Sequence, residues 1–394
     1  MQALPQFYLP GFRVAFKLKR RALAAVCAVL LLSACGTTEP VVKPTELTSI
    51  DKQTRVDRLW KYKFAKADKG VFQPFVLDNT VFAASRSGEV VALESESGKL
   101  KWRRKLDATL SSGIAGVNNV LFVSNQDGVV IALNAANGNT LWETPASSEV
   151  LKPISAAFGF MVVRSADGRL LSLNPADGTE RWSSTYTPPA LTLNGYSRPL
   201  LLDGGVLVGL DDGRLLALSS EDGSLLWESV LSVPSGRSEI ERLVDIDGSI
   251  RVDDNGIYVV NYQGRFARVE PAKGQIVWSV PMSSTAGLDV SDTTAVVVAD
   301  DDTVQGFDKS NGQLLWTQEA LKHRRLSAPQ FINDKHVLIG DVEGYLHTID
   351  SASGNLVGRS RVAKKTIYPE MVMANDIVYV QSADGIVSAL SAAE

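Results

Sequence analysis

Acidic clusters are the residues whose types and spacing come closest to metal or acid–base chemistry in this chain. Three such clusters occur, at Asp211-Asp212, Asp253-Asp254 and Asp300-Asp301-Asp302. Each falls where a hairpin turn is expected, and Asp is common in turns because its carboxylate accepts hydrogen bonds from nearby backbone amides. We therefore expect these residues to form solvated turns, and we expect no metal site and no cofactor.

The other residues that could support catalysis show no ligand or nucleophile pattern. The three histidines, His323, His336 and His347, lack the spacing of a zinc site. No glycine-rich phosphate loop and no nucleophile elbow follows a predicted strand. The sequence therefore predicts packing or surface roles for these side chains, in a protein that is not an enzyme.

Cys35 is a predicted site of lipid attachment, because it directly follows a predicted secretion signal. An apolar stretch from Ala22 to Leu32 follows the basic residues Arg13, Lys17, Lys19, Arg20 and Arg21. The stretch is too short to span a bilayer, which takes about 20 apolar residues, and this order is typical of a signal peptide. Leu32-Ser33-Ala34-Cys35 also resembles the bacterial lipobox, whose cysteine is acylated and becomes the first mature residue.

These features divide the chain into three parts. We predict a signal peptide over residues 1–34, a flexible linker over 35–52 that starts from acylated Cys35, and a folded domain over 53–394. Gly36 follows the cysteine, and the resemblance to lipoproteins then implies sorting to the outer membrane, at its periplasmic face. Cys35 is the only cysteine of the mature chain, so an intramolecular disulfide is excluded.

The charge of the mature chain limits its partners. Five of the 40 Lys and Arg residues and none of the 44 acidic residues lie in residues 1–34, which leaves a net charge of −9. Such a balance argues against nucleic acid, and against anionic lipid headgroups as the main partner. We expect the membrane to be contacted through the lipid anchor only.

The element that must position any site is a repeat of about 40 residues, a period that belongs to four-stranded propeller blades. In six units a Gly or Asp is followed four residues later by a pair such as Ala-Leu, then by Gly, then by Trp. The tryptophans of these units are Trp102, Trp142, Trp182, Trp227, Trp278 and Trp316. A seventh unit has Gly358 where Trp is due, and an eighth runs into the chain end after Leu390.

Trp60 supplies what the eighth unit lacks, since it stands 42 residues before Trp102. We therefore predict an all-β fold: an eight-bladed β-propeller of four-stranded antiparallel blades, with the N- and C-terminal strands sharing the closing blade. Closure of this kind removes two exposed sheet edges. Seven full repeats followed by an unrelated tail is the alternative.

The segment from Ala132 to Trp142, like that from Ser172 to Trp182, resembles the tryptophan-docking repeat of pyrroloquinoline quinone (PQQ) proteins. Two classes share that repeat: quinoprotein dehydrogenases and the noncatalytic BamB family of the outer-membrane β-barrel assembly machinery, whose layout residues 35–394 match. The enzyme class implies a calcium-held quinone and, in many members, a disulfide between adjacent cysteines, which this chain cannot form. A PQQ-dependent periplasmic oxidoreductase is thus the alternative function, and a ligand-sensing propeller is a third.

Uneven repeat spacing points to a binding site. The second glycines of the units (98, 138, 178, 223, 274, 312 and 354) are separated by 40, 40, 45, 51, 38 and 42 residues. The extra residues fall in 183–198 and 228–249, each after an outer-strand Trp. Insertions at equivalent points of adjacent repeats emerge side by side on one face.

The family resemblance gives these insertions a partner. They look like the BamB segments that contact the POTRA domains of BamA, and the match transfers to Leu191, Leu193, Asp245 and Asp247, while Asn194 stands where the family pattern has Arg. The resemblance also implies help to unfolded outer-membrane protein substrates, which exposed blade edges could bind as added strands. The alternative is that Asp245-Ile246-Asp247 caps a turn and the leucines pack locally.

Overall fold

The computed structural model describes residues 43–51, 53–64, 72–151, 153–193, 197–248, 250–368 and 370–391. In these ranges the chain forms strands β1 to β32 and no helix, so none of its described elements is a helix able to cross a membrane. Residues 44–394 form one compact unit. The predicted signal peptide, Cys35 and the first part of the predicted linker lie outside the described residues, and these assignments stay predictions.

The strands form eight four-stranded sheets that follow one another along the chain. Blades 1 to 4 contain β2 (Phe75–Leu77), β3 (Thr80–Ala84), β4 (Glu89–Glu94) and β5 (Leu100–Lys105); β6 (Ala115–Val117), β7 (Val120–Ser124), β8 (Val129–Asn134) and β9 (Thr140–Pro145); β10 (Ser155–Ala157), β11 (Phe160–Arg164), β12 (Arg169–Leu173) and β13 (Glu180–Thr185); and β14 (Leu200–Leu202), β15 (Gly205–Gly209), β16 (Arg214–Ser219) and β17 (Leu225–Val230).

Blades 5 to 8 contain β18 (Arg251–Asp253), β19 (Gly256–Val260), β20 (Gly264–Val269) and β21 (Ile276–Met282); β22 (Gly287–Val290), β23 (Thr294–Val298), β24 (Val304–Asp308) and β25 (Leu314–Gln318); β26 (Gln330–Asn333), β27 (His336–Gly340), β28 (Tyr345–Asp350) and β29 (Leu356–Arg361); and β30 (Val372–Ala374), β31 (Ile377–Ser382), β32 (Ile386–Ser391) and β1 (Arg58–Lys63). All neighbouring strands within a blade are antiparallel, and the last strand in each group lies outermost.

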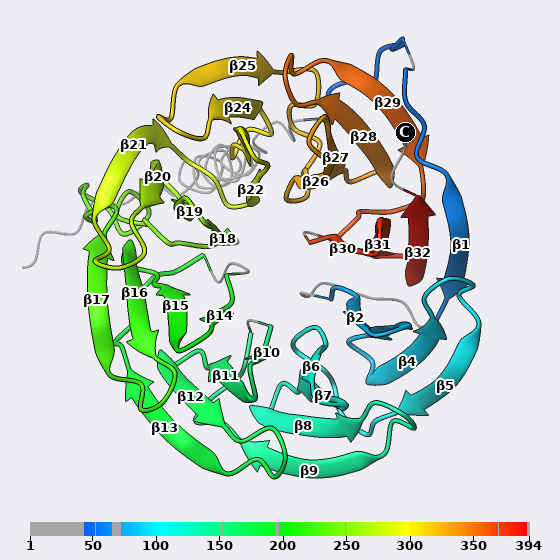
Figure 1. Cartoon of the computed structure of the whole chain (residues 1–394), viewed down its shortest axis with the longest axis vertical. Coiled ribbons are helices and arrows are strands. Elements are labelled where there is room, and N and C mark those ends of the chain that lie inside the picture. Colours follow the sequence, from blue (N-terminus) through cyan, green and yellow to red (C-terminus); the bar gives the residue numbers. More distant parts are fainter. Residues whose placement is uncertain are drawn as a thin grey trace, which may run out of the picture. The chain divides into compact units, whose positions relative to one another are not determined.

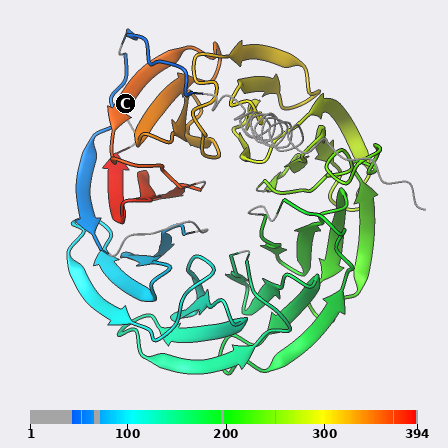
Figure 2. The same cartoon turned by 180° about the vertical axis from the view of Figure 1, so that it is seen from behind.

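The ring closes because the first strand of the chain completes the last blade. β1 pairs with β32, with Trp60 opposite Ala389 and Lys63 opposite Ile386. Figures 1 and 2 show this closing blade, with β1 in blue beside β32 in red. The prediction of an eight-bladed propeller with both chain ends in one blade is confirmed, and the alternative of seven repeats and a tail is wrong.

The tryptophans of the outermost strands pack on the blade that follows. The indole of Trp102 lies against Gly138 of blade 2, where an added Cβ would come within 2.7 Å of the ring. Gly138 also has a φ of 71°, so glycine suits both the turn and the close approach. Six of the seven indole N–H groups donate to a carbonyl of the next blade, as Trp102 does to Ala135 at 2.8 Å. Among the described residues, Trp278 Nε1 has no partner.

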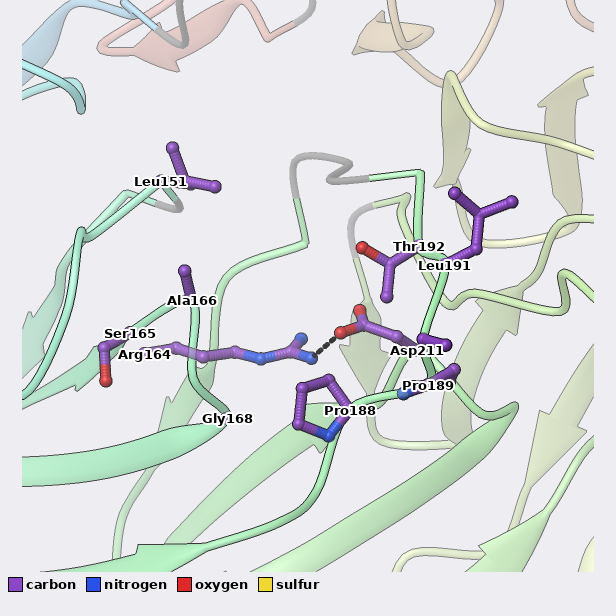
Figure 3. Close-up of a pocket in the computed structure, with 11 residues that line it drawn as sticks. Leu151, Arg164, Ser165, Ala166, Gly168, Pro188, Pro189, Leu191, Thr192 and Asp211 are labelled. Carbon is purple, nitrogen blue, oxygen red and sulfur yellow. Dashed lines mark hydrogen bonds and ion pairs between the residues drawn. The ribbon is translucent and has the colours of Figure 1, made fainter. Parts of the chain in front are cut away.

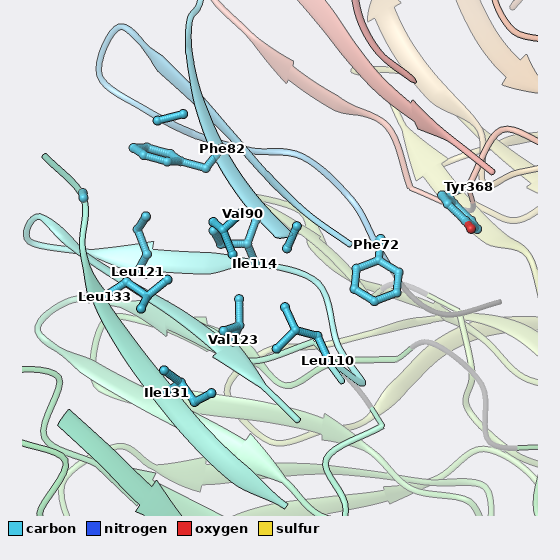
Figure 4. Close-up of a cluster of buried hydrophobic side chains, with 13 residues drawn as sticks. Phe72, Phe82, Val90, Leu110, Ile114, Leu121, Val123, Ile131, Leu133 and Tyr368 are labelled. Carbon is cyan, nitrogen blue, oxygen red and sulfur yellow. The ribbon is translucent and has the colours of Figure 1, made fainter. Parts of the chain in front are cut away.

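The apolar core lies between adjacent blades. The second and third strands of each blade supply most of the buried side chains, as β3 and β4 illustrate. Figure 4 shows the cluster shared by blades 1 and 2, in which Phe82 and Val90 pack with Leu121 and Leu133. Because each blade buries its two faces against two neighbours, the stability of any blade depends on a closed ring.

Gly358 stands in β29, where the outermost strands of the other blades carry Trp. It lies opposite Thr348 of β28. Blade 8 has no turn that could receive an indole here, since its outermost strand β1 comes from the other end of the chain. The N-terminal segment fills the space instead: the amides of Gln53 and Thr54 donate to Val357 O at 2.8 and 3.1 Å. A Cβ on Gly358 would lie 2.7 Å from Thr54 Oγ1. Glycine is therefore required by the way the ring closes.

The segment before β1 contacts blade 7 as far back as Thr45. Arg324 Nη1 donates to Thr45 O at 2.7 Å, and Arg359 Nη1 donates to Thr48 O at 2.8 Å. Leu47 packs against the apolar cluster between blades 6 and 7. The described part of the predicted linker thus lies on the ring.

Candidate partner-binding sector

Two connections between neighbouring blades are longer than the others, and they are adjacent in the ring. The first insertion, residues 186–199, joins β13 to β14, and the second insertion, residues 231–250, joins β17 to β18. The equivalent connection from β9 to β10 spans only residues 146–154. Both insertions run from an outermost strand to the next innermost strand, so they emerge on the same face of the propeller. We name this part of the ring the insertion sector.

A hydrogen bond joins the two insertions. The Leu193 amide donates to Asp245 Oδ2 at 2.7 Å, and Asp245 and Asp247 are both fully buried. This differs from the expectation that the two carboxylates face a partner, because the chain around them turns into the ring. In this conformation Asp245 ties the two insertions together, and neither Asp245 nor Asp247 is accessible to a partner.

The apolar residue between the two carboxylates explains the inward turn. Ile246 is fully buried and packs on Gly209 so closely that no Cβ would fit there. The Ile246 amide donates to Leu210 O at 3.1 Å, and the Tyr262 amide donates to Asp245 O at 2.9 Å. The second insertion therefore bridges turns of blades 4 and 5, and its two aspartates lie between them.

Asp211, expected in a solvated turn, belongs to a largely buried acidic cluster. Asp211, Asp245 and Asp247 each place one carboxylate oxygen within 4.8 Å of the others. Arg164 Nη2 donates to Asp211 Oδ2, and Arg164 Nη1 donates to Gly209 O, both at 2.7 Å. The guanidinium is itself only 6% exposed, so it offsets part of the clustered negative charge where water is scarce.

Arg164 is a site residue that sequence reasoning missed. The signal was its position in the repeat: the residues four before the first glycine of blades 1, 2 and 4 are Ala84, Ser124 and Gly209, whereas blade 3 has an arginine there. A charged side chain at a position that is otherwise small and buried needs a charged partner. Asp211 of the next blade is that partner.

A pocket of about 230 Å³ lies between the first insertion and blade 3. Figure 3 shows Leu191 and Thr192 on one side and Leu151 on the other, with the ion pair of Arg164 and Asp211 between them. The pocket has both apolar and charged walls, which suits a side chain of a protein partner.

Apolar side chains of both insertions remain exposed to solvent. Leu191 is 41% exposed in the first insertion, and Val233 and Ile240 are 72% and 64% exposed in the second. Leu193 is partly buried. Asn194 lies outside the described residues, so its predicted role stays a prediction. These aliphatic side chains on two adjacent connections offer contact area to a protein partner.

The other acidic clusters make contacts within the ring. Asp253 accepts a hydrogen bond from Lys309 Nζ at 2.7 Å and so links blades 5 and 6. Asp302 accepts hydrogen bonds from the amides of Arg325 and Leu326 at 2.7 and 2.8 Å, and burial raises the pKa of its carboxyl. These aspartates connect blades.

His347 also has a structural environment. It is fully buried, and its Nε2 lies 2.9 Å from Asp341 Oδ2, an atom that also pairs with Arg324 at 2.7 Å. Burial lowers the pKa of His347, although its bond to Asp341 acts in the opposite direction. Since Arg324 also holds Thr45, this charged cluster fastens the N-terminal segment to blade 7.

The acidic cluster of the insertion sector does not fit the calcium-held quinone of the quinoprotein dehydrogenases. Calcium takes six to eight oxygen ligands. Within the described residues the cluster offers three carboxylates, of which Asp211 is paired with a guanidinium. We therefore derive no chemistry from it.

Fold and repeat together define a propeller of the PQQ-like repeat class, with one sector of long connections between adjacent blades. A family model described as "Outer membrane protein assembly factor BamB" matches residues 45–112, 108–318 and 300–394. The chain belongs to the BamB family of outer membrane protein assembly factors.

Individual relatives agree with this assignment. BamB of Pseudomonas aeruginosa is 39% identical over 365 residues, which cover 92% of this chain and 96% of that protein. The crystal structure of BamB from Moraxella catarrhalis has a TM-score of 0.79 at 26% identity, over 86% of this chain and 100% of that chain. Quinohemoprotein alcohol dehydrogenase from Comamonas testosteroni has a TM-score of 0.70 over 86% of this chain and 78% of that chain, but at 12% identity it shares the fold alone. Family membership places this chain among assembly factors and not among the quinoprotein enzymes.

Proposed function

We propose that this chain is a scaffold that binds the POTRA region of BamA through its insertion sector and assists the folding and insertion of outer-membrane proteins. The observation that carries the proposal is the tie between two long connections of adjacent blades, made by the Leu193 amide and Asp245. Loops that are already held together lose less conformational freedom when they bind.

The exposed residues of the sector support a protein partner. Leu191, Val233 and Ile240 provide aliphatic contact area, and the centres of protein interfaces are depleted in charge. The pocket beside Leu191 offers a place for one anchoring side chain of the partner. In this proposal Leu191 and Leu193 contribute contacts, and Asp245 and Asp247 position them.

The predicted lipid on Cys35 gives the scaffold its location. Acylation would hold the chain at the periplasmic face of the outer membrane, where unfolded outer-membrane proteins reach the assembly machinery. The contacts of Thr45 and Thr48 with blade 7 support a short connection between lipid and ring.

Co-purification of BamA tests the insertion sector. The variant Leu191→Asp with Ile240→Asp places charge on the exposed side chains without touching the buried aspartates. We expect BamA recovery to fall about tenfold, which corresponds to about 1.4 kcal/mol of binding free energy.

A matched control changes leucines of similar exposure on other blades. Leu141 and Leu314 are 47% and 49% exposed, on β9 and β25, and Leu141→Asp with Leu314→Asp should retain BamA. Full recovery with the insertion variant would contradict the proposal, and so would an equal loss with the control.

A further inference from the structure

The outermost strands of the ring differ sharply in charge. Three consecutive outermost strands, β29, β1 and β5 of blades 7, 8 and 1, contain no acidic residue and nine basic ones: Arg359, Arg361, Arg58, Lys61, Lys63, Lys101, Arg103, Arg104 and Lys105. The five outermost strands of blades 2 to 6 together contain one basic residue, Arg181, and three acidic ones, Glu143, Glu180 and Glu228. We name the nine cations of β29, β1 and β5 the basic rim.

Most of these cations are exposed, and the contacts that they make leave much of their positive charge uncompensated. All of them are exposed except Arg359, which is half-buried. Lys101 donates to Thr80 Oγ1 at 2.6 Å, and Arg104 donates to Asn139 Oδ1 at 2.8 Å, which are neutral acceptors. Arg103 pairs with Glu89. The rim is therefore a cationic surface on a chain whose net charge is negative.

A groove of about 660 Å³ crosses the rim at the junction of blades 7 and 8. Four arginines line it, Arg55, Arg58, Arg359 and Arg361, together with Asp57, which pairs with Arg55 at 2.6 Å. Burial and the nearby Arg324 lower the pKa of Arg359, as expected where positive charges gather. Guanidinium groups bind phosphate oxygens through two parallel hydrogen bonds, so the groove suits a phosphate group.

The predicted lipid anchor enters the ring in this same sector. The described N-terminal segment runs over β29 into β1, and Thr45 contacts Arg324 in the connection from blade 6 to blade 7. Cys35 stands ten residues earlier, and an extended chain covers about 3.3 to 3.6 Å per residue. An acyl chain on Cys35 would thus keep Thr45 within roughly 35 Å of the membrane surface.

Protection of exposed sheet edges does not explain the pattern. Lysine on an edge strand discourages pairing with other chains, but the edges of blades 5 and 6 need that protection as much and lack it. Their strands β21 and β25 have no charged residue, and they expose Val277, Leu314 and Leu315. The cations are concentrated where the chain leads to its anchor.

We propose that the basic rim, with the arginine groove at its centre, binds the anionic phosphate headgroups of a lipid membrane. Basic clusters next to an anchoring segment are attracted to anionic lipid surfaces, and a lipid chain plus a basic patch anchors more firmly than a lipid chain alone. The ring then lies with blades 7, 8 and 1 toward the membrane. This inference does not depend on binding to BamA.

Vesicle flotation tests the proposal with the chain from residue 36 onward, which lacks the acylated cysteine and keeps the whole compact unit 44–394. We expect it to float with phosphatidylcholine vesicles that contain phosphatidylglycerol and not with pure phosphatidylcholine. Binding should disappear near 1 M salt, where the Debye length falls to about 3 Å. The variant Lys61→Gln, Lys63→Gln, Lys101→Gln should bind at least about tenfold more weakly.

A matched control removes three exposed cations elsewhere. Arg181→Gln, Lys273→Gln, Lys335→Gln lowers the net charge equally and should bind like the parent chain, and thermal unfolding checks that both variants fold. Equal flotation with neutral and anionic vesicles would overturn the proposal, as would equal losses in both variants. Capture of poly-glutamate by the rim without any vesicle binding would also overturn it, in favour of an acidic protein partner.

Discussion

The hydrogen bond from the Leu193 amide to Asp245 joins residues that are 52 positions apart. Removal of the Asp245 carboxylate leaves the Leu193 amide without that acceptor. Because Asp245 is fully buried, the loss of this hydrogen bond costs about 1–3 kcal/mol. We expect Asp245→Ala to lower the free energy of unfolding by about this amount. Urea unfolding measures the change.

Asp292→Ala is the matched control, because Asp292 is exposed and surface substitutions usually stay within about 0.5 kcal/mol. If both variants unfold at the same urea concentration, Asp245 does not hold the insertions together. If only Asp245→Ala is destabilised, the role of this carboxylate is positional, as its burial indicates.

Sequence reasoning located the insertions but not the direction of their side chains. The glycine spacing placed extra residues after Trp182 and Trp227 because each repeat adds one blade of nearly constant length. The alternation around Asp245 and Asp247, however, allows either face of the segment to point outward. Which face is buried depends on how the segment packs against blade 4. Arg164 of blade 3 contributes to that packing, and the local sequence pattern does not predict its contact.

The N-terminal segment explains why the seventh repeat has glycine where the other repeats have tryptophan. Gly358 breaks the tryptophan pattern, and the structure shows Thr54 in the space that a side chain there would take. A Cβ at this position would lie 2.7 Å from Thr54 Oγ1 and 2.9 Å from Thr348 Oγ1. Overpacking of this kind costs about 1–3 kcal/mol, so Gly358→Ala should be destabilised by that amount in urea or thermal unfolding.

Gly205→Ala is a suitable comparison, since its added Cβ would lie 3.7 Å from the nearest neighbour, at ordinary contact distance. We expect it to be neutral or slightly stabilising. Thr54→Ala should recover part of the stability lost in Gly358→Ala, because it removes the Oγ1 that the new methyl group meets. Unchanged stability of Gly358→Ala would mean that the segment is not packed on β29.

The closing strand was predictable, whereas the path that leads to it was not. Trp60 identified β1 because it supplies the outermost-strand tryptophan of blade 8, a position that every blade except blade 7 fills with Trp. Residues 44–51 have no such period, and their place on blade 7 rests on single contacts, such as Arg324 with Thr45 and Arg359 with Thr48. Contacts between residues about 300 positions apart cannot be predicted from the local sequence.

The insertion sector and the basic rim lie on opposite sides of the ring. The insertions flank blade 4 and the rim is centred on blade 8, four blades away in a ring of eight (Figure 1). Net charge alone led us to expect membrane contact only through the lipid anchor. The distribution of charge over β29, β1 and β5 argues for a second contact with the membrane. Electrostatic attraction in salt solution extends over about 10 Å, so the local charge of a surface matters more than the net charge of the molecule.

Opposite placement predicts that the ring binds an anionic membrane and the POTRA region of BamA at the same time. In vesicle flotation at low salt, a soluble POTRA fragment should float with anionic vesicles only when the unacylated ring is present. Leu191→Asp with Ile240→Asp should float alone, without the fragment, whereas Lys61→Gln, Lys63→Gln, Lys101→Gln should leave both proteins behind. Displacement of the fragment by anionic vesicles would contradict this arrangement, since two surfaces four blades apart cannot compete for one position.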